Sequence, residues 1–181
     1  MGGINLRKAT RGDAAALGAL HVASWREAYS GIMPDAMLAG ISVEARTAMW
    51  DEVLGDPEAF GGTSVFVAED SGRMVGFGSC GGQRDPALAR AGFDGEITAL
   101  YVLRSHQKRG VGRSIMSAMA ERLSALGYSG LGLWVLRDNV PARAFYEGLD
   151  GTIVGEKSDK RFAGALVEVA LGWSDLPDLR G

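Results

Sequence analysis

The segment Gln107–Ser114, QKRGVGRS, combines two glycines with three basic side chains between an apolar run and an amphipathic one. The run before it, EITALYV, has the β-branched and aromatic residues of a buried strand. After it, the residues from Gly112 to Leu126 carry an apolar stripe at helical spacing, formed by Ile115, Met116, Met119, Leu123 and Leu126. The sequence therefore predicts a strand, a glycine-containing loop and a helix in direct succession.

A loop of this kind can hold an anion at the N-terminus of the helix. The backbone N–H groups of residues 109–113 can point outward there, where the positive end of the helix dipole adds to their effect. Gly110 and Gly112 permit positive φ and leave room for a phosphate to approach the backbone. Positive charge is added by Lys108, Arg109 and Arg113. An ordinary helix start with solvated cations is the alternative, because an isolated Gly-x-Gly is a weak signature.

Composition and charge limit the classes of protein to which the chain can belong. Its 181 residues, 46% of them hydrophobic, are enough for one sizeable core, so we expect a single domain over residues 1–181. A formal net charge of -3 offers no broad cationic surface, and nucleic-acid binding is therefore not expected. The single cysteine, Cys80, and the distant histidines His21 and His106 leave no zinc spacing, so no metal is expected.

The sequence gives no sign of a membrane segment. No apolar stretch is long enough to cross a bilayer, and the first ten residues, MGGINLRKAT, lack the apolar core of a signal peptide. Leu6 stands where a myristoylation motif would have Ser or Thr. We therefore expect a cytoplasmic protein with no membrane partner.

The rest of the chain alternates between helix and strand signals. Thr10 and Asp13 form a capping-box-like start for a first helix, and a second helix is predicted from about Pro34 to Leu54. SVFVAED and RMVGFGSC, separated by Ser71-Gly72, indicate an antiparallel hairpin. After the loop GGQRDPALARAGFDG and the central unit come a strand LGLWVL, a short helix NVPARAFYEGL and two closing strands, TIVGEK and ALVEVALGW. This order predicts a mixed α/β protein.

Three segments resemble one family. QKRGVG resembles the Gln/Arg-x-x-Gly-x-Gly/Ala signature of the GNAT superfamily of N-acetyltransferases, which use it to bind the pyrophosphate of acetyl-coenzyme A (acetyl-CoA). GEITALYV resembles the central strand of that family, and NVPARAFYEGL resembles its Asn-x-x-Ala-x-x-Phe-Tyr-Glu segment. The segments occur in the family order between Glu96 and Leu149, and the flanking elements extend the match over most of the chain.

The resemblance implies a fold and an activity. The fold would be α/β (α+β), a single GNAT-like domain whose central mixed, mostly antiparallel sheet is flanked by helices, with an acetyl-CoA-binding core at about residues 96–149. The activity would be transfer of an acetyl group from acetyl-CoA to a primary amine of an unidentified small-molecule or peptide acceptor. The amine would attack directly in a ternary complex, without an acyl-enzyme and without a metal. A homodimer is compatible with this fold.

The resemblance also assigns roles to residues. Glu96, eleven residues before Gln107, would be the general base, although a solvated glutamate at a strand start is the alternative. A bulge in the strand would free the N–H of Leu100 to hold the thioester oxygen, and Val102 would bond the pantetheine arm. Tyr146 would protonate the departing thiolate, or would serve only in packing. The coenzyme-binding residues implied in this way are Leu100, Val102, Gln107, Lys108, Arg109, Gly110, Val111, Gly112, Arg113, Asn139 and Tyr146.

Local patterns add detail to these roles. Strict alternation places one set of side chains on one side of the central strand (Glu96, Thr98, Leu100 and Val102) and the other set on the opposite side (Ile97, Ala99 and Tyr101). Asn139 can cap the helix that begins at Val140 and, by resemblance, also bond the pantetheine. Arg104 replaces the proline that often follows the central strand in the family, which adds a cation near the phosphates.

The acceptor side is the part that the sequence defines least. Trp25 and Tyr29, four residues apart on one helical face, either line an acceptor pocket or serve in core and lid packing. Asp35, Asp94 and Glu96 are candidate carboxylates for a cationic amine. A non-catalytic acyl-CoA-binding sensor stays open as the alternative function, although binding alone would need neither a general base nor a general acid.

Overall fold

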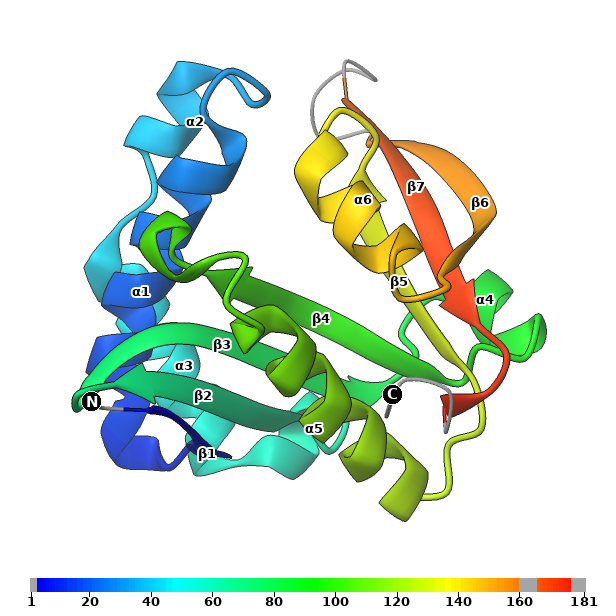
Figure 1. Ribbon diagram of the computed structural model, residues 1–181, viewed down its shortest axis with the longest axis horizontal. Helices are drawn as coiled ribbons and strands as arrows, with labels where there is room; N and C mark the ends of the chain where they lie inside the picture. The colour runs from blue at the N-terminus through cyan, green and yellow to red at the C-terminus, as the bar shows by residue number, and fades with distance from the viewer. Residues whose placement is uncertain (1–2, 160–165, 177–181) are drawn as a thin grey trace.

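The computed structural model describes residues 3–159 and 166–176, and within these ranges the strands join in one mixed sheet (Figure 1). The strands are β1 (Ile4–Lys8), β2 (Ser64–Asp70), β3 (Arg73–Gly82), β4 (Gly95–Val102), β5 (Leu131–Leu136), β6 (Thr152–Asp159) and β7 (Leu166–Trp173). Their order is β1-β2-β3-β4-β5-β7-β6, and only β4 and β5 run parallel to each other. The predicted mixed, mostly antiparallel sheet flanked by helices is confirmed.

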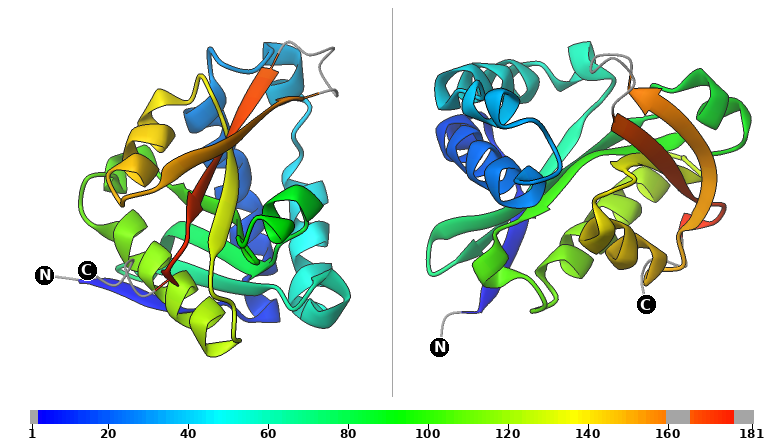
Figure 2. Two further views of the ribbon diagram at one scale, coloured as in Figure 1. Left: turned by 90° about the vertical axis from the view of Figure 1, so that its right-hand side faces the viewer. Right: turned by 90° about the horizontal axis from the view of Figure 1, so that it is seen from above.

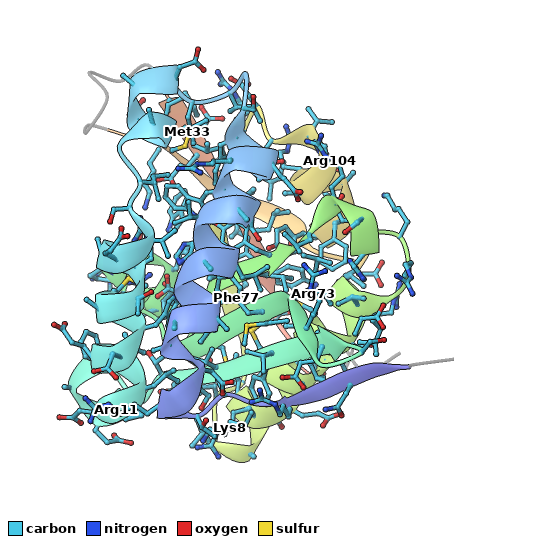
Figure 3. All side chains as sticks on the ribbon, turned by 90° about the vertical axis from the view of Figure 1, so that its left-hand side faces the viewer. Lys8, Arg11, Met33, Arg73, Phe77 and Arg104 are labelled. Atoms are coloured by element: carbon cyan, nitrogen blue, oxygen red, sulfur yellow. The ribbon has the colours of Figure 1, made fainter. Side chains whose placement is uncertain are left out.

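Helices cover both faces of the sheet. They are α1 (Ala14–Tyr29), α2 (Asp35–Ala39), α3 (Val43–Gly55), α4 (Pro86–Arg90), α5 (Val111–Ala125) and α6 (Val140–Glu147). Figure 2 shows α1 and α3 on one face, and α5 and α6 on the other. Ile115 and Met119 of α5 lie in the core on one face of the sheet. Leu17 of α1 and Trp50 of α3 lie in the core on the other face together with Phe77, which Figure 3 labels in a view from the α1 side. In the part of the chain that the structure describes, no helix is long and apolar enough to span a membrane.

The sheet splits between β4 and β5. Their parallel pairing covers Gly95 opposite Leu131 and Glu96 opposite Gly132, and beyond these positions the two strands separate (Figure 1). β4 continues to pair with β3, while β5 pairs with β7 along its whole length. The facing edges of β4 and β5 therefore diverge, which leaves room between the two halves of the sheet.

The prediction of one continuous helix from Pro34 to Leu54 is wrong. α2 ends with Gly40 as its C-cap, and α3 starts after Ser42, whose Oγ accepts a hydrogen bond from Ala45 N at 3.1 Å. A serine N-cap satisfies an amide of a new helix, so it stabilises a break that apolar spacing alone does not reveal. The predicted loop after β3 likewise contains α4, which Asp85 caps and Pro86 begins.

A β-bulge overturns the predicted alternation along β4. The register with β3 shifts so that Ile97 lies opposite Cys80 and Ala99 lies opposite Ser79, with Thr98 as the extra residue. Ile97 consequently enters the core beneath α5, whereas Ala99 packs against the core beneath α1. The bulge that the resemblance implied for this strand is present, and it places Ile97 and Ala99 on opposite faces.

Two turns contain residues with positive φ. Ser71 and Gly72, with φ of 53° and 78°, close the predicted hairpin between β2 and β3. Asp150 adopts φ of 63° after α6, a left-handed conformation that aspartate tolerates better than most residues. The packing there comes from Trp173, whose Nε1 donates to Leu149 O at 2.7 Å. An aromatic side chain from β7 thus fills the space under the last strands.

The side chain of His21, a residue of α1, is buried in the core between α1 and the sheet. Its Nδ1 accepts a hydrogen bond from Trp50 Nε1 at 3.2 Å, and its ring contacts those of Phe77 and Tyr101. Burial lowers the pKa of His21 to about 4, and the charge of Arg46 contributes to the same shift. The imidazole is therefore neutral at neutral pH and stabilises packing between α1 and α3.

The contact between α1 and α3 yields a test of this packing. We expect Gly18→Ala to destabilise the protein by about 1–3 kcal/mol, because an overpacked contact forces the backbone to shift. A Cβ at position 18 would lie 2.7 Å from the backbone N of Thr47, so α3 would have to move away from α1. Urea unfolding followed by tryptophan fluorescence measures the change. Gly12→Ala is the matched control, since its Cβ would come no closer than 3.8 Å to a neighbour; equal stability of the two variants would contradict the packing.

Candidate active site

A cleft of about 1260 Å³ lies between β4 and β5 and extends to α1 and α6. The predicted site residues that line it are Trp25, Tyr29, Glu96, Leu100, Val102, Gln107, Lys108, Gly110, Gly112, Arg113, Asn139 and Tyr146. Two others do not face it: the Val111 side chain is 2% exposed in the core, and the Arg109 guanidinium lies 3.7 Å from Asp70. The split in the sheet thus gathers residues from distant parts of the chain in one cavity.

The turn between β4 and α5 has the backbone of an anion site. Gly110, with φ of 82°, caps α5, and Lys108 before it has φ of 58°. The α-helical hydrogen bonds begin with Ser114 N donating to Gly110 O at 3.0 Å, so the amides of the turn before Ser114 stand at the positive end of the helix. Gly112 also permits close packing, because a Cβ there would lie 3.3 Å from the Phe145 ring. Glycine is therefore required at both positions for different reasons.

Hydrogen bonds tie this turn to the neighbouring elements. Gln107 Nε2 donates to Val102 O at 3.0 Å, which holds the turn against the end of β4. Arg104 N donates to Glu27 Oε2 at 2.7 Å, and Arg104 Nη2 donates to Glu27 O at 2.8 Å. A proline at position 104 would lack the N–H that bonds Glu27. The departure from the family pattern thus anchors the turn to α1.

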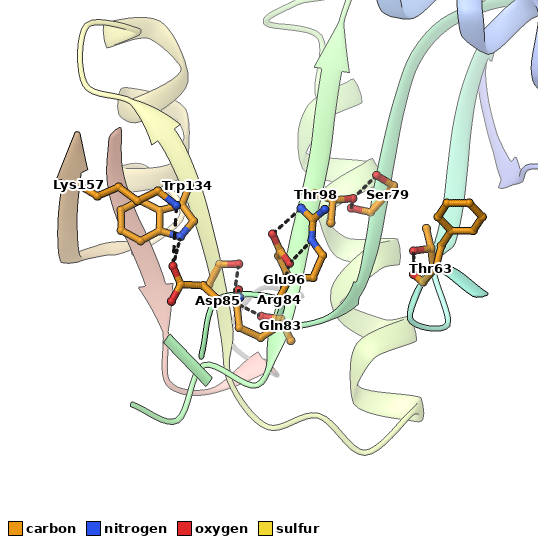
Figure 4. Close-up of polar contacts among 12 residues, drawn as sticks. Thr63, Ser79, Gln83, Arg84, Asp85, Glu96, Thr98, Trp134 and Lys157 are labelled. Atoms are coloured by element: carbon orange, nitrogen blue, oxygen red, sulfur yellow. Dashed lines mark hydrogen bonds and ion pairs between the residues drawn. The ribbon is translucent and has the colours of Figure 1, made fainter. Parts of the chain in front are cut away.

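Glu96 is bound to Arg84, a residue that the sequence analysis did not identify (Figure 4). Glu96 Oε2 accepts from Arg84 N at 3.0 Å and Arg84 Nε at 2.8 Å, and Oε1 accepts from Arg84 Nη2 at 2.9 Å. These bonds are the main cause of the raised pKa of Arg84. The Glu96 side chain is only 8% exposed, so its carboxylate is bound by this bidentate partner and hardly by solvent.

Tyr146 and Asn139 form the α6 side of the cleft. The Tyr146 ring packs against Phe145 and Trp173, with centroids 5.2 and 6.2 Å away. Burial raises the pKa of Tyr146 well above that of a free phenol, so its hydroxyl keeps its proton at neutral pH. Asn139 Oδ1 accepts from Ala142 N at 3.3 Å, which confirms its role as the N-cap of α6.

An aromatic wall faces Tyr146 across the cleft. The Trp25 and Tyr29 rings meet edge to face with centroids 5.2 Å apart, as their spacing predicts. The hydroxyl groups of Tyr29 and Tyr101 lie 2.9 Å apart. Because all three aromatic residues line the cavity, this wall is both packed and accessible from the cleft.

The acidic residues that line the cleft differ from the acceptor carboxylates that the sequence indicated. Of the candidates Asp35, Asp94 and Glu96, only Glu96 lines the cleft, because Asp94 accepts bonds from the backbone of the loop before β5, at 3.0 Å from Ser129 N and 2.8 Å from Gly130 N. The cleft instead contains Asp85 and Glu168, together with Trp134 and Lys157. No local motif marks these residues, since they come from a loop and three strands that only the fold brings together.

Neither a nucleophilic thiol nor a metal centre is found in this part of the molecule. Cys80 is fully buried, and burial raises the pKa of its thiol to about 12, which disfavours the thiolate that a nucleophile would need. Among the described residues, no three histidine, cysteine or acidic side chains are placed to hold a metal ion.

Comparisons with known proteins agree with this geometry. The family model described as Acetyltransferase (GNAT) family matches residues 19–150. The chain is 32% identical over 178 residues to a protein described as uncharacterized N-acetyltransferase YuaI of Bacillus subtilis (strain 168), with 98% of this chain and 96% of the relative covered.

Solved structures of acetyltransferases share the fold. PaiA N-acetyltransferase from Thermoplasma acidophilum, in complex with coenzyme A, has a TM-score of 0.76 at 16% identity, covering 94% of this chain and 99% of that one. YncA from Salmonella typhimurium, solved with acetyl-CoA, has a TM-score of 0.67 at 19% identity, covering 94% of this chain and 93% of that one. Because the family model spans most of the sequence and the relative spans nearly all of it, the chain belongs to the GNAT family of acetyltransferases and is an acyltransferase.

Proposed function

We propose that this acyltransferase moves an acetyl group from acetyl-CoA to the primary amine of an acceptor in the cleft between β4 and β5. The proposal rests on one observation: the turn between β4 and α5, the edge of β4, Glu96 and Tyr146 line the same cavity. The fold shared with PaiA in complex with coenzyme A and with YncA in complex with acetyl-CoA supports this cosubstrate. We treat the whole chain as one domain with its coenzyme-binding core at about residues 96–149.

In this proposal the coenzyme follows the open edge of β4. Its pyrophosphate binds the amides at the start of α5, where Lys108 and Arg113 supply positive charge. The main chain of Val102 and the side chain of Asn139 bond the pantetheine arm. The N–H of Leu100 holds the thioester oxygen as negative charge develops on it. The acetyl carbon then faces the acceptor side of the cleft.

The proposed reaction is a direct attack in the ternary complex. The neutral amine nitrogen attacks the thioester carbon, and a tetrahedral intermediate forms with its oxyanion on the β4 backbone. Glu96 takes the amine proton, directly or through one water, and the C–S bond breaks as the amide forms. Tyr146 donates its proton to the departing thiolate, because burial keeps that hydroxyl protonated. The products are the acetylated amine and free coenzyme A, and exchange with solvent removes the proton from Glu96 and returns one to Tyr146.

Arg84 has a positioning role in this scheme. It places one N–H on Oε1 of Glu96 and two on Oε2, so Oε1 keeps an acceptor position for the amine proton. A buried carboxylate without such a partner would be costly to keep ionised. Arg84 thereby orients the Glu96 carboxylate before the acceptor arrives. The alternative of a non-catalytic acyl-CoA sensor uses the same ion pair as a structural element only, and turnover separates the two functions.

Gly110→Ala tests the coenzyme site. We expect acetyl-CoA to bind roughly tenfold or more weakly, since the methyl group enters phosphate space and positive φ becomes strained. Gly127→Ala is the matched control at the other end of α5, because both glycines have positive φ and neither Cβ would meet an atom within 4 Å. Titration calorimetry gives both affinities. An affinity equally unchanged in the two variants would remove the α5 turn from the coenzyme site.

Glu96→Gln tests the general base. We expect kcat to fall by roughly 10²- to 10⁴-fold with acetyl-CoA affinity retained, because an amide cannot accept the amine proton at neutral pH. The measurement is release of the coenzyme A thiol against a panel of polyamines, amino acids, aminoglycosides and N-terminal peptides. Glu121→Gln, on the exposed side of α5, controls for loss of one negative charge. Wild-type turnover in Glu96→Gln would refute the base assignment, and silence of the wild type across the panel would favour the sensor.

Tyr146→Phe tests the general acid. We expect thiol release to slow by roughly 10²-fold with little change in coenzyme affinity, because the ring stays and only the proton donor is lost. Tyr128→Phe removes a hydroxyl from a tyrosine outside the cleft lining and serves as the control. If Tyr146→Phe unfolds at lower urea while its remaining folded fraction turns over normally, the residue acts in packing alone.

A further inference from the structure

The cleft wall formed by β5, β6 and β7 holds the ammonium group of Lys157 among groups that bind cations. Lys157 Nζ lies 3.8 Å from the centroid of the Trp134 ring, 3.8 Å from Asp85 Oδ2 and 3.8 Å from Glu168 Oε2. Figure 4 shows the lysine side chain over the Trp134 ring, next to Asp85. An aromatic face with two carboxylates is the chemistry of a receptor for an alkylammonium ion. We call Asp85, Trp134 and Glu168 the ammonium site.

Sheet register and hydrogen bonds fix the three groups of the ammonium site. Lys157 of β6 lies directly opposite Glu168 of β7, so their side chains leave the same face of the sheet. Asp85 Oδ2 accepts from Trp134 Nε1 at 3.1 Å, and Asp85 Oδ1 accepts from Ala87 N at 2.9 Å. Because these bonds do not involve the lysine, Asp85 and Trp134 keep their positions when the lysine side chain is shortened, and the sheet register keeps Glu168 on the same face.

All three residues of the ammonium site and the lysine line the same cleft as Glu96. Asp85 directly follows Arg84, which binds Glu96, so the site adjoins the proposed general base. The charge of Glu168 also acts on Tyr29 of the aromatic wall. Burial is the main cause of the raised pKa of Tyr29, and the negative charge of Glu168 raises this pKa further. An amine bound near Glu96 therefore has the lysine ammonium as a neighbour.

We propose that Lys157 determines acceptor specificity by occupying, from within the chain, a position that would otherwise bind a second ammonium group of the acceptor. The inference rests on the proposed function and narrows its substrate class to amines that carry a single positive charge. A diamine would bring its second ammonium against an occupied site of like charge. The lysine balances only one of the two carboxylates, so its removal leaves a vacant site with an aromatic face and net negative charge.

Binding of 1,4-diaminobutane to the full chain with coenzyme A, measured by titration calorimetry, tests the inference directly. We expect Lys157→Ala to bind the diamine roughly tenfold more tightly than the wild type, because the vacated site gains an ammonium ion. Lys157→Arg retains a cation and is expected to bind as the wild type does. Lys8→Ala removes the same charge from β1, outside the cleft lining, and controls for net charge. Equal diamine affinity in Lys157→Ala and Lys8→Ala overturns the inference.

Turnover provides a second readout that separates the inference from the proposed function. The ratio of kcat/KM for 1,4-diaminobutane to kcat/KM for butylamine is expected to rise roughly tenfold in Lys157→Ala. An unchanged ratio in an active enzyme overturns the inference alone. Failure of the wild type to acetylate any amine of a broad panel overturns the proposed function, whereas the binding comparison still decides whether Lys157 fills an ammonium site.

A second variant protects the test against loss of folding. The Lys157 side chain is 43% exposed, so its truncation is expected to leave the sheet intact. Lys157→Met retains the apolar stem over Trp134 and removes only the charge. With this variant a smaller gain in diamine affinity over Lys8→Ala supports the inference, and no gain overturns it.

Discussion

The separation of β4 from β5 after Glu96 is the constraint on which the site depends. A sheet edge exposes backbone donors and acceptors, and here the two edges face each other across a cleft instead of pairing. β4 is held on its other side by β3, and β5 by β7, so beyond Glu96 both strands are ordered without pairing with each other. The bulge at Thr98 alters the faces of β4 just beyond the last paired residues. Backbone groups and side chains of two half-sheets thus line one cavity.

The two ends of the cleft differ in charge. At the α5 end, Lys108 and Arg113 stand beside the amides of a helix N-terminus, which favours a polyanion. At the other end, three carboxylates (Asp85, Glu96 and Glu168) outnumber the two cations Arg84 and Lys157 beside aromatic rings, which favours one further cation. In the proposed function, the local field at the first end would attract the coenzyme and the field at the second end would attract the amine. The proposal therefore assigns two substrates of opposite charge to opposite ends of one cavity.

The sequence predicts the structural elements that depend only on residues close together in the chain. Neighbouring residues determine the apolar stripe predicted from Gly112 to Leu126, the hairpin at Ser71-Gly72 and the N-cap at Asn139. The structure has a helix over Val111–Ala125, the hairpin and the N-cap at these places. Arg84 escapes prediction because its partner is 12 residues away on the next strand and no spacing rule links a loop cation to a strand glutamate. Lys157 and its ammonium site escape it for the same reason, since pairing of β6 with β7 brings them together. The prediction of which β4 side chains share a face is wrong because an alternating sequence pattern does not reveal a bulge.

The difference in solvent exposure between Arg84 and Glu96 bears on how Glu96 would act as the proposed base. Their side chains are 72% and 8% exposed, so solvent reaches the cation and hardly reaches the carboxylate. Moving Glu96 away from Arg84 would leave a buried charge without a partner, which is costly. Moving Arg84 toward water costs far less, because its guanidinium is already largely hydrated. When an acceptor ammonium approaches Oε1, it can replace the attraction that Arg84 provides, and the exposed arginine is the partner that can yield. In the proposed mechanism, the ion pair thus orients Glu96 before an amine binds and leaves it able to exchange Arg84 for that amine.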